Sequence, residues 1–221
     1  MTAPGTVIVM AKEPLPGRVK TRLCPPYTPR ESASLAAAAL ADTLAAVTRA
    51  PATRRILCLA GDPDHISGAG AFEVVPQVDG GLDVRLAAAL DLVVGSVLLI
   101  GMDTPQLLPE DLDLPGCPAG GAGGAATAQA WLGLAEDGGW WALGLTHPDP
   151  ALVAGVAMSR PDTGARQLQR LRGAGLMVTM LRTLRDVDTA ADVAAVAALA
   201  PATQFAATAA ALPGHSAPGA G

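Results

Sequence analysis

Residues 7–26 read VIVMAKEPLPGRVKTRLCPP, an apolar run followed directly by a basic segment that is broken by prolines and a glycine. The only two lysines of the chain, Lys12 and Lys20, both lie here. Arg18 and Arg22 accompany them, against a single acid, Glu13. A short apolar run rich in β-branched residues is typical of a buried strand. The stretch therefore predicts a buried strand that ends in an open, positively charged loop.

Outward from this stretch, apolar runs alternate with helical segments. Strands are predicted at 6–11, 56–60, 72–75, 96–100, 140–145 and 176–181, with a further one expected at 127–132, and helices are predicted at 32–47, 82–94, 164–171 and 190–199. This alternation predicts an α/β fold of three layers, with a mostly parallel central sheet covered by helices on both faces. In such sheets ligands bind at the carboxyl ends of the strands.

The length of 221 residues suits a single domain, which we place at residues 1–200. Residues 201–221 are rich in alanine and end in LPGHSAPGAG, which predicts a disordered tail. Residues 115–126, PGCPAGGAGGAA, predict a flexible loop. Half of the residues are hydrophobic but only 3% are aromatic, so the core must be built from Ala, Val and Leu.

The charge and the cysteines exclude several classes of protein. A net charge of −5 argues against nucleic acid as a partner, because such proteins normally present a basic face. Cys24, Cys58 and Cys117 are widely spaced and form no CxxC, which indicates reduced thiols rather than disulfides or a zinc site. The first residues do not form a signal peptide and no apolar run could span a membrane, so we expect a cytoplasmic protein.

The basic loop is suited to phosphate. Backbone N–H groups between a strand and a helix attract anions, and lysine and arginine add charge and directed hydrogen bonds. We expect Lys12, Gly17, Arg18, Lys20 and Arg22 to bind the phosphates of a nucleotide. Neither the GxxxxGK[ST] loop of the ATPases nor the GxGxxG fingerprint of dinucleotide-binding proteins is present. The alternative is a solvated cluster of charges without a ligand.

Asp103 follows the predicted strand at 96–100 within the motif GMDTP. A carboxylate at the end of a buried strand can bind a divalent cation that bridges phosphates. It can equally cap the turn that follows, as aspartate often does. Since the basic loop should lie at the same edge of the sheet, we expect Asp103 to face it.

The motif EDGGWWALGL at 136–145 contains a turn followed by two tryptophans. An Asp-Gly-Gly turn is ordinary between paired strands. The functional alternative is a rim for a second substrate, with Asp137, Gly138, Gly139 and Trp140 on the acceptor side.

The motif RDVDTAADV at 185–193 precedes a predicted helix. Asp188 and Thr189 are suited to cap that helix, and Asp192 falls in its first turn. Alternatively, Asp186 or Asp188 turns inward and completes a metal site.

Taken in order, these motifs resemble a bacterial family of glycosyltransferase-A-fold transferases, whose members are uncharacterised or assigned to arsenosugar biosynthesis. MAKEPLPGRVKTRL, the DTP motif, EDGGWWALGL and DVDTAAD all match the pattern of that family, over about residues 5–198. The chain departs from it at Asp83, where glycine is usual, at Leu134, where proline is usual, and in the glycine-rich interval after DTP.

The resemblance implies a Rossmann-like nucleotide-diphospho-sugar transferase fold. It places Lys12, Gly17, Arg18, Lys20 and Arg22 on the phosphates of the donor, and residues 137–140 on the acceptor side. It also places Asp103 at the position of a bound Mg²⁺ or Mn²⁺ ion, with Asp188 near a second metal position.

The leading interpretation is a metal-assisted glycosyltransferase that uses a nucleoside diphosphate sugar and a small-molecule acceptor. Asp103 and its metal would neutralise the departing diphosphate, and Asp137 is a candidate base. The first alternative is a nucleotidyltransferase that takes a nucleoside triphosphate and a phosphorylated or hydroxylated acceptor and releases pyrophosphate. The second is a nucleotide-binding protein without catalysis, which the glycine-rich interval suggests.

Overall fold

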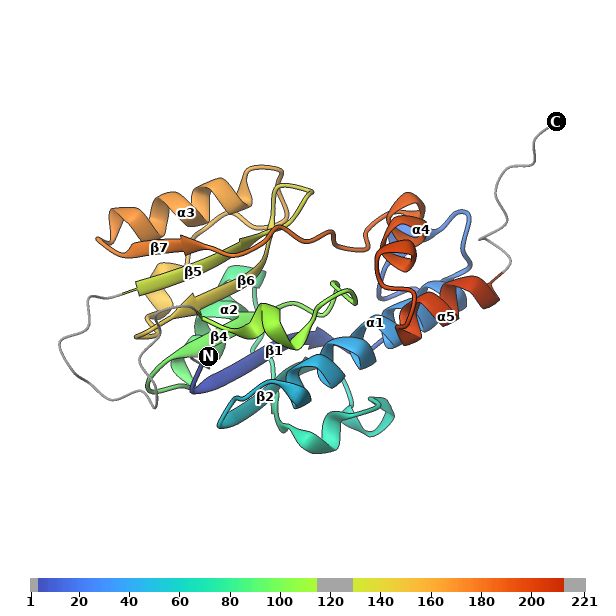
Figure 1. Cartoon of the computed structure of the whole chain (residues 1–221), viewed down its shortest axis with the longest axis horizontal. Coiled ribbons are helices and arrows are strands. Elements are labelled where there is room, and N and C mark those ends of the chain that lie inside the picture. Colours follow the sequence, from blue (N-terminus) through green and yellow to red (C-terminus); the bar gives the residue numbers. More distant parts are fainter. Residues whose placement is uncertain (1–3, 115–128, 213–221) are drawn as a thin grey trace.

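The computed structural model describes residues 4–114 and 129–212, and over these residues its centre is a seven-stranded sheet (Figure 1). The strand order is β3-β2-β1-β4-β6-β5-β7. The strands are β1 (Thr6–Lys12), β2 (Arg54–Ala60), β3 (Glu73–Pro76), β4 (Val97–Ile100), β5 (Gln129–Leu134), β6 (Trp140–Leu145) and β7 (Met177–Met180). Only β6 runs antiparallel to its neighbours β4 and β5, whereas the other pairings are parallel. The predicted mostly parallel sheet is therefore confirmed.

Helices cover both faces of this sheet. Helix α1 (Pro29–Arg49) packs on one face, and α2 (Leu82–Asp91) and α3 (Thr163–Gly173) pack on the other. Successive residues of β1 alternate between the two sides: Val7 and Val9 join the core under α1, while Ile8 and Met10 join the core under α2. The three-layer α/β arrangement expected from the sequence is confirmed.

Local sequence signals account for the helix ends. Helix α1 begins with a capping box, in which Thr28 and Glu31 satisfy each other's backbone N–H groups, and with Pro29 in its first turn. It ends before Pro51, because the residue preceding proline disfavours helical geometry. Helix α4 (Ala190–Leu199) has the same box, formed by Thr189 and Asp192. Each predicted strand and helix is present, with ends displaced by at most three residues.

The predicted disordered tail is wrong over its first part. Residues 204–211 form helix α5 (Gln204–Ala211), which lies with α4 beside α1 (Figure 1). Phe205 is fully buried in the core that these three helices share. The carboxylate of Asp42 on α1 accepts hydrogen bonds from the backbone N–H groups of Gln204 at 3.0 Å and Phe205 at 2.8 Å. The domain therefore extends past residue 200, because α1 supplies both an apolar surface and a cap.

Some expectations fall outside the described residues. These are the flexible loop at 115–126, the last part of the predicted tail at 213–221, and Cys117. Cys24 and Cys58 are free thiols. No helix within 4–114 and 129–212 combines the length and the apolar character needed to cross a lipid bilayer.

Candidate functional site

A cleft of about 980 Å³ opens at the carboxyl ends of β1 and β4, beside the turn that joins β5 to β6. Its lining includes most of the residues singled out from the sequence: Lys12, Arg18, Lys20, Arg22, Asp103, Asp137, Gly139, Trp140 and Asp188. Gly17 and Gly138 lie outside this lining. The expectation that the basic loop and Asp103 meet at one edge of the sheet is confirmed.

Lys20 is the centre of the cleft's charge network. Its Nζ atom lies 2.9 Å from Oδ1 of Asp103 and 3.1 Å from Oδ1 of Asp188. The Lys20 side chain is only 9% exposed, whereas those of Asp103 and Asp188 are 41% and 34% exposed. One buried ammonium thus joins two carboxylates that are far apart in the sequence.

The pKa of Lys20 reflects this position. Burial lowers it, but the charges of Asp103 and Asp188 and the hydrogen bonds to them outweigh burial, so the pKa of Lys20 is raised above 10.5. A raised pKa means that the folded state holds the proton more tightly than the unfolded chain. The resulting stabilisation is complete below pH 10.5 and is lost only as the pH rises through the higher folded-state value. Lys20 is therefore a permanent cation at physiological pH.

The remaining cations of the basic loop are more exposed. Arg22 contacts Oδ2 of Asp188 through Nη1 at 3.3 Å, with a side chain that is 73% exposed. In the described part of the chain, no side-chain hydrogen bond or ion pair engages Lys12 or Arg18. Two cations that line the cleft thus remain available for an anion.

Asp186 is a further acid in the cleft. Its Oδ1 atom is buried, with no hydrogen-bond partner among the described residues. Burial, followed by the negative charges of Asp137, Asp188 and Asp103, raises the pKa of Asp186 from 3.8 to about 7. Because the folded state holds this proton more tightly, Asp186 favours folding most below pH 3.8, and that contribution declines as the pH rises to about 7.

The donor atoms of the cleft are suited to a hard cation. Asp103 and Asp188 supply carboxylate oxygens, which Mg²⁺ and Mn²⁺ prefer over nitrogen or sulfur. Within the described residues, no three His, Cys, Asp or Glu side chains form a complete metal-binding group. Mg²⁺ is commonly held by one or two carboxylates together with substrate phosphates and water, and this pair fits that pattern.

The predicted turn at 137–139 is present. The carboxylate of Asp137 accepts a hydrogen bond from the backbone N–H of Gly139 at 2.7 Å, which is ordinary turn chemistry. Gly138 has φ +89°, and a Cβ atom there would lie 1.9 Å from the carbonyl oxygen of Pro161. The glycine thus permits close approach by the segment before α3. The backbone N–H of Gly164 also donates to the carbonyl of Gly138 at 2.8 Å.

We expect Gly138→Ala to lower the free energy of unfolding by at least about 2 kcal/mol, because it combines left-handed backbone strain with a collision against backbone. Gly17→Ala is the matched control: Gly17 has φ +76°, but nothing lies within 4 Å of a Cβ atom there. It should cost about 1 kcal/mol. Urea unfolding of both variants measures the difference, and equal losses would contradict the steric argument.

Several polar residues line the cleft without having been singled out, and protein contacts hold three of them. Gln77 donates to the carbonyls of Ala11 and Cys58, both at 2.8 Å, and accepts from Nη1 of Arg85 at 3.2 Å. The third, Arg185, pairs with Asp192 at 2.9 Å and Glu136 at 3.5 Å. Arg85 could have been noticed, since it lies in the first turn of the helix that follows β3. The role of Gln77 depends on two strands meeting, which the sequence does not show.

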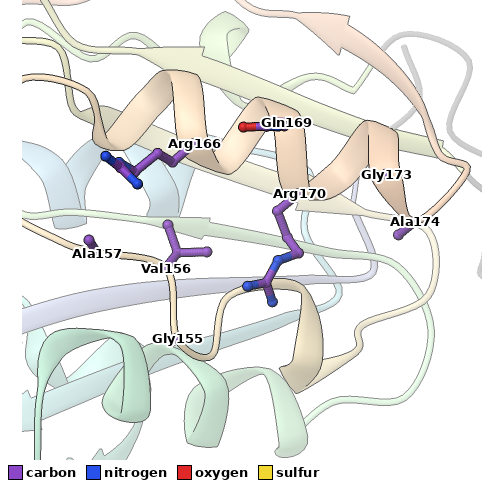
Figure 2. A pocket seen from close by; sticks show the side chains of 8 residues that line it. All are labelled: Gly155, Val156, Ala157, Arg166, Gln169, Arg170, Gly173 and Ala174. Atoms are coloured by element: carbon purple, nitrogen blue, oxygen red, sulfur yellow. The ribbon is translucent and has the colours of Figure 1, made fainter.

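Figure 2 shows a second hollow, of about 570 Å³, between α3 and the segment at 155–157. Both arginines that line this hollow already have partners within the protein. Arg170 donates to the carbonyls of Ala151 at 2.7 Å and Ala154 at 3.1 Å. Arg166 pairs with Asp162 at 2.6 Å. Arg170 thus connects α3 to the segment at 151–154, whereas Arg166 pairs with the residue that precedes its own helix.

The sheet with its single antiparallel strand, and the basic loop facing an acid after β4, define the class of protein as the nucleotide-diphospho-sugar transferase fold. A crystal structure from Desulfovibrio desulfuricans G20, provisionally described as a nucleotide-diphospho-sugar transferase, superposes with a TM-score of 0.76 and 25% identity, over 94% of each chain. CMP:2-keto-3-deoxy-manno-octonic acid synthetase in complex with CTP shares the fold, with a TM-score of 0.52 and 13% identity, over 89% of this chain and 98% of that one.

The chain belongs to the DUF2064 family, described as an uncharacterized protein conserved in bacteria, whose model matches residues 43–160. It is also 34% identical over 224 residues to a phosphoenolpyruvate guanylyltransferase of Thermomonospora curvata, covering 96% of this chain and 92% of that protein. These findings support the superfamily expected from the sequence. They do not support the narrower assignment to arsenosugar biosynthesis.

Proposed function

We propose that the protein is a nucleotidyltransferase. It transfers a nucleoside monophosphate from a nucleoside triphosphate to a phosphorylated small molecule and releases pyrophosphate. The observation that carries this proposal is the pairing of Lys20 with Asp103 and Asp188 in a cleft that two free cations, Lys12 and Arg18, also line. The guanylyltransferase relative of 34% identity makes GTP and phosphoenolpyruvate the first pair to try.

The basic loop binds the triphosphate in this proposal. Lys12 and Arg18 contact the β- and γ-phosphates, which leave together as pyrophosphate. Lys20 stays charged throughout the physiological range and offsets the charge that grows on the leaving group. An acceptor oxygen forms a bond to the α-phosphorus as the bond between that phosphorus and the bridging oxygen breaks.

Asp103 and Asp188 would hold a Mg²⁺ or Mn²⁺ ion through their carboxylate oxygens. Such an ion supplies Lewis-acid stabilisation of phosphate charge when it is bound. Lys20 keeps the two carboxylates together without it, since its Nζ atom contacts both. Asp103 and Asp188 are therefore oriented before any substrate enters.

A phosphorylated acceptor changes what is required of Asp137. A phosphate oxygen is already ionised at neutral pH, so its attack needs no general base. Asp137 instead stabilises the 137–139 turn through its hydrogen bond with the backbone N–H of Gly139. In this proposal the acceptor binds beside that turn. Trp140 lines the cleft next to this turn.

Glycosyl transfer from a nucleoside diphosphate sugar is the second candidate. The Desulfovibrio relative, with its provisional description as a nucleotide-diphospho-sugar transferase, favours it. Both reactions use the same phosphate site, so the two candidates differ in the donor that binds and in the product that leaves.

Thermal unfolding with a panel of nucleotides tests the proposal. The panel contains GTP, ATP, CTP and UTP and, separately, the nucleoside diphosphate sugars of the same four bases. Each compound is tested with and without Mn²⁺. A ligand at one hundred times its dissociation constant adds about 2.7 kcal/mol of stability. We expect a metal-dependent rise in Tm with one triphosphate, GTP first. A rise with a nucleotide sugar alone would overturn the proposal in favour of glycosyl transfer.

A further inference from the structure

Two residues that line the cleft have a strained backbone conformation. Among the described residues other than glycine, only Lys20 and Ser159 have a positive φ, of 47° and 57°. Both line the cleft. Non-glycine residues held in this region cost free energy and gather at functional sites. Lys20 is explained by its ion pairs, but nothing in the phosphate site explains Ser159.

The segment after Ser159 is firmly positioned. The hydroxyl of Thr163 accepts a hydrogen bond from the backbone N–H of Arg160 at 3.1 Å and donates to the carbonyl of Ala157 at 2.9 Å. Pro161 lies against Gly138 so closely that no side chain fits between them. The segment is thus fixed both to α3 and to the 137–139 turn.

The strained turn presents Arg160 to the cleft. Arg160 is exposed and lines the cleft, and its side chain forms no hydrogen bond or ion pair with the described residues. Its neighbour Asp162 pairs with Arg166 instead. An arginine whose backbone is fixed and whose side chain forms no hydrogen bond or ion pair is available to an anion, since a guanidinium can bind a carboxylate or phosphate through two parallel hydrogen bonds.

Unpartnered positive charge therefore lines the cleft from two separate elements. Lys12 is the last residue of β1 and Arg18 lies in the loop that follows, whereas Arg160 belongs to the segment before α3. The triphosphate accounts for the first group. Arg160 remains available for a second anion, and the acceptor is the remaining substrate.

We propose that Arg160 is a specificity-determining residue that binds a non-reacting anionic group of the acceptor. This inference rests on the proposed nucleotidyl transfer. It names the acceptor class as a phosphorylated carboxylic acid rather than a sugar or polyol phosphate: the phosphate reacts, and the carboxylate is held by Arg160. Ser159 and the 137–139 turn position the arginine.

The test is steady-state release of pyrophosphate, with the triphosphate that stabilises the protein and two acceptors. Phosphoenolpyruvate carries a carboxylate beside its phosphate, whereas sn-glycerol 3-phosphate carries hydroxyl groups instead. We expect Arg160→Gln to raise the KM for phosphoenolpyruvate about 10- to 100-fold, the range for losing a charged hydrogen bond. The KM for the triphosphate should stay within about twofold. Arg160→Lys should restore part of the loss.

Arg166→Gln is the matched control, since Arg166 lies in α3, close in sequence to Arg160, but outside the cleft lining. It should leave both KM values unchanged. An unchanged KM for phosphoenolpyruvate in Arg160→Gln would overturn the inference while the proposed function stood. So would equal losses for both substrates, or a wild-type protein that prefers glycerol 3-phosphate. Absence of pyrophosphate from the wild-type protein with every triphosphate and both acceptors would overturn the proposed function itself.

Discussion

Replacing Asp103 with asparagine should lower turnover about 10³-fold, because it removes a carboxylate that we place on the metal and that aligns Lys20. Binding of the triphosphate without metal should not weaken, since the substitution removes a negative charge facing the phosphates. The fold should persist, because the Asp103 side chain is 41% exposed and Lys20 retains its contact with Asp188.

Two measurements separate these effects: pyrophosphate release for turnover, and titration calorimetry with the triphosphate in the absence of metal for binding. Asp79→Asn is a charge-matched control in an exposed residue outside the cleft lining. It should behave as the wild-type protein does. If Asp103→Asn kept full turnover, the assignment of this carboxylate to the reaction would be wrong. If the wild-type protein bound nucleotide but never turned over, the protein would be a non-catalytic nucleotide-binding protein.

Replacing Lys20 with methionine should lower kcat about 10²- to 10³-fold and also weaken triphosphate binding. Methionine keeps much of the length of the side chain but removes the cation. It leaves Asp103 and Asp188 facing each other without their shared counterion. Loss of binding together with turnover would distinguish Lys20→Met from Asp103→Asn, for which we expect loss of turnover alone.

Arg22→Gln provides a graded comparison for Lys20. Its side chain is 73% exposed and contacts only Asp188, so we expect a loss of about tenfold or less in turnover. Arg30→Met, an exposed residue of α1 outside the cleft lining, should have no effect. Equal losses in the Lys20 and Arg22 variants would show that bulk positive charge, rather than the buried position of Lys20, supports the reaction.

Much of the fold could be predicted because its signals are local. The apolar strands β1 and β4 are buried throughout except at Lys12, and such runs are recognisable without any knowledge of their partners. Helix α5 was missed because its alanine-rich sequence resembles a low-complexity tail. Its stability depends on Phe205 entering the core beside α1 and on the cap from Asp42, and both contacts join segments more than 160 residues apart.

The site residues, too, could be predicted only where their signals are local in the sequence. The phosphate loop could be located from the two lysines that follow a buried strand, and Asp103 from its place after another. Asp137 and Gly138 were recognised as a turn, but their contact with the segment at Pro161 could not be foreseen. Arg160 was missed for that reason, because the sequence does not show that its segment lies beside this turn and lines the cleft.

The product released from the nucleotide distinguishes nucleotidyl transfer from glycosyl transfer. The protein is incubated with Mg²⁺, phosphoenolpyruvate and a triphosphate labelled at its α-phosphate, and separately with the matching nucleoside diphosphate sugar. We expect pyrophosphate to leave and the labelled nucleoside monophosphate to become joined to phosphoenolpyruvate. Release of nucleoside diphosphate from the sugar nucleotide, with no pyrophosphate from the triphosphate, would contradict it and restore glycosyl transfer.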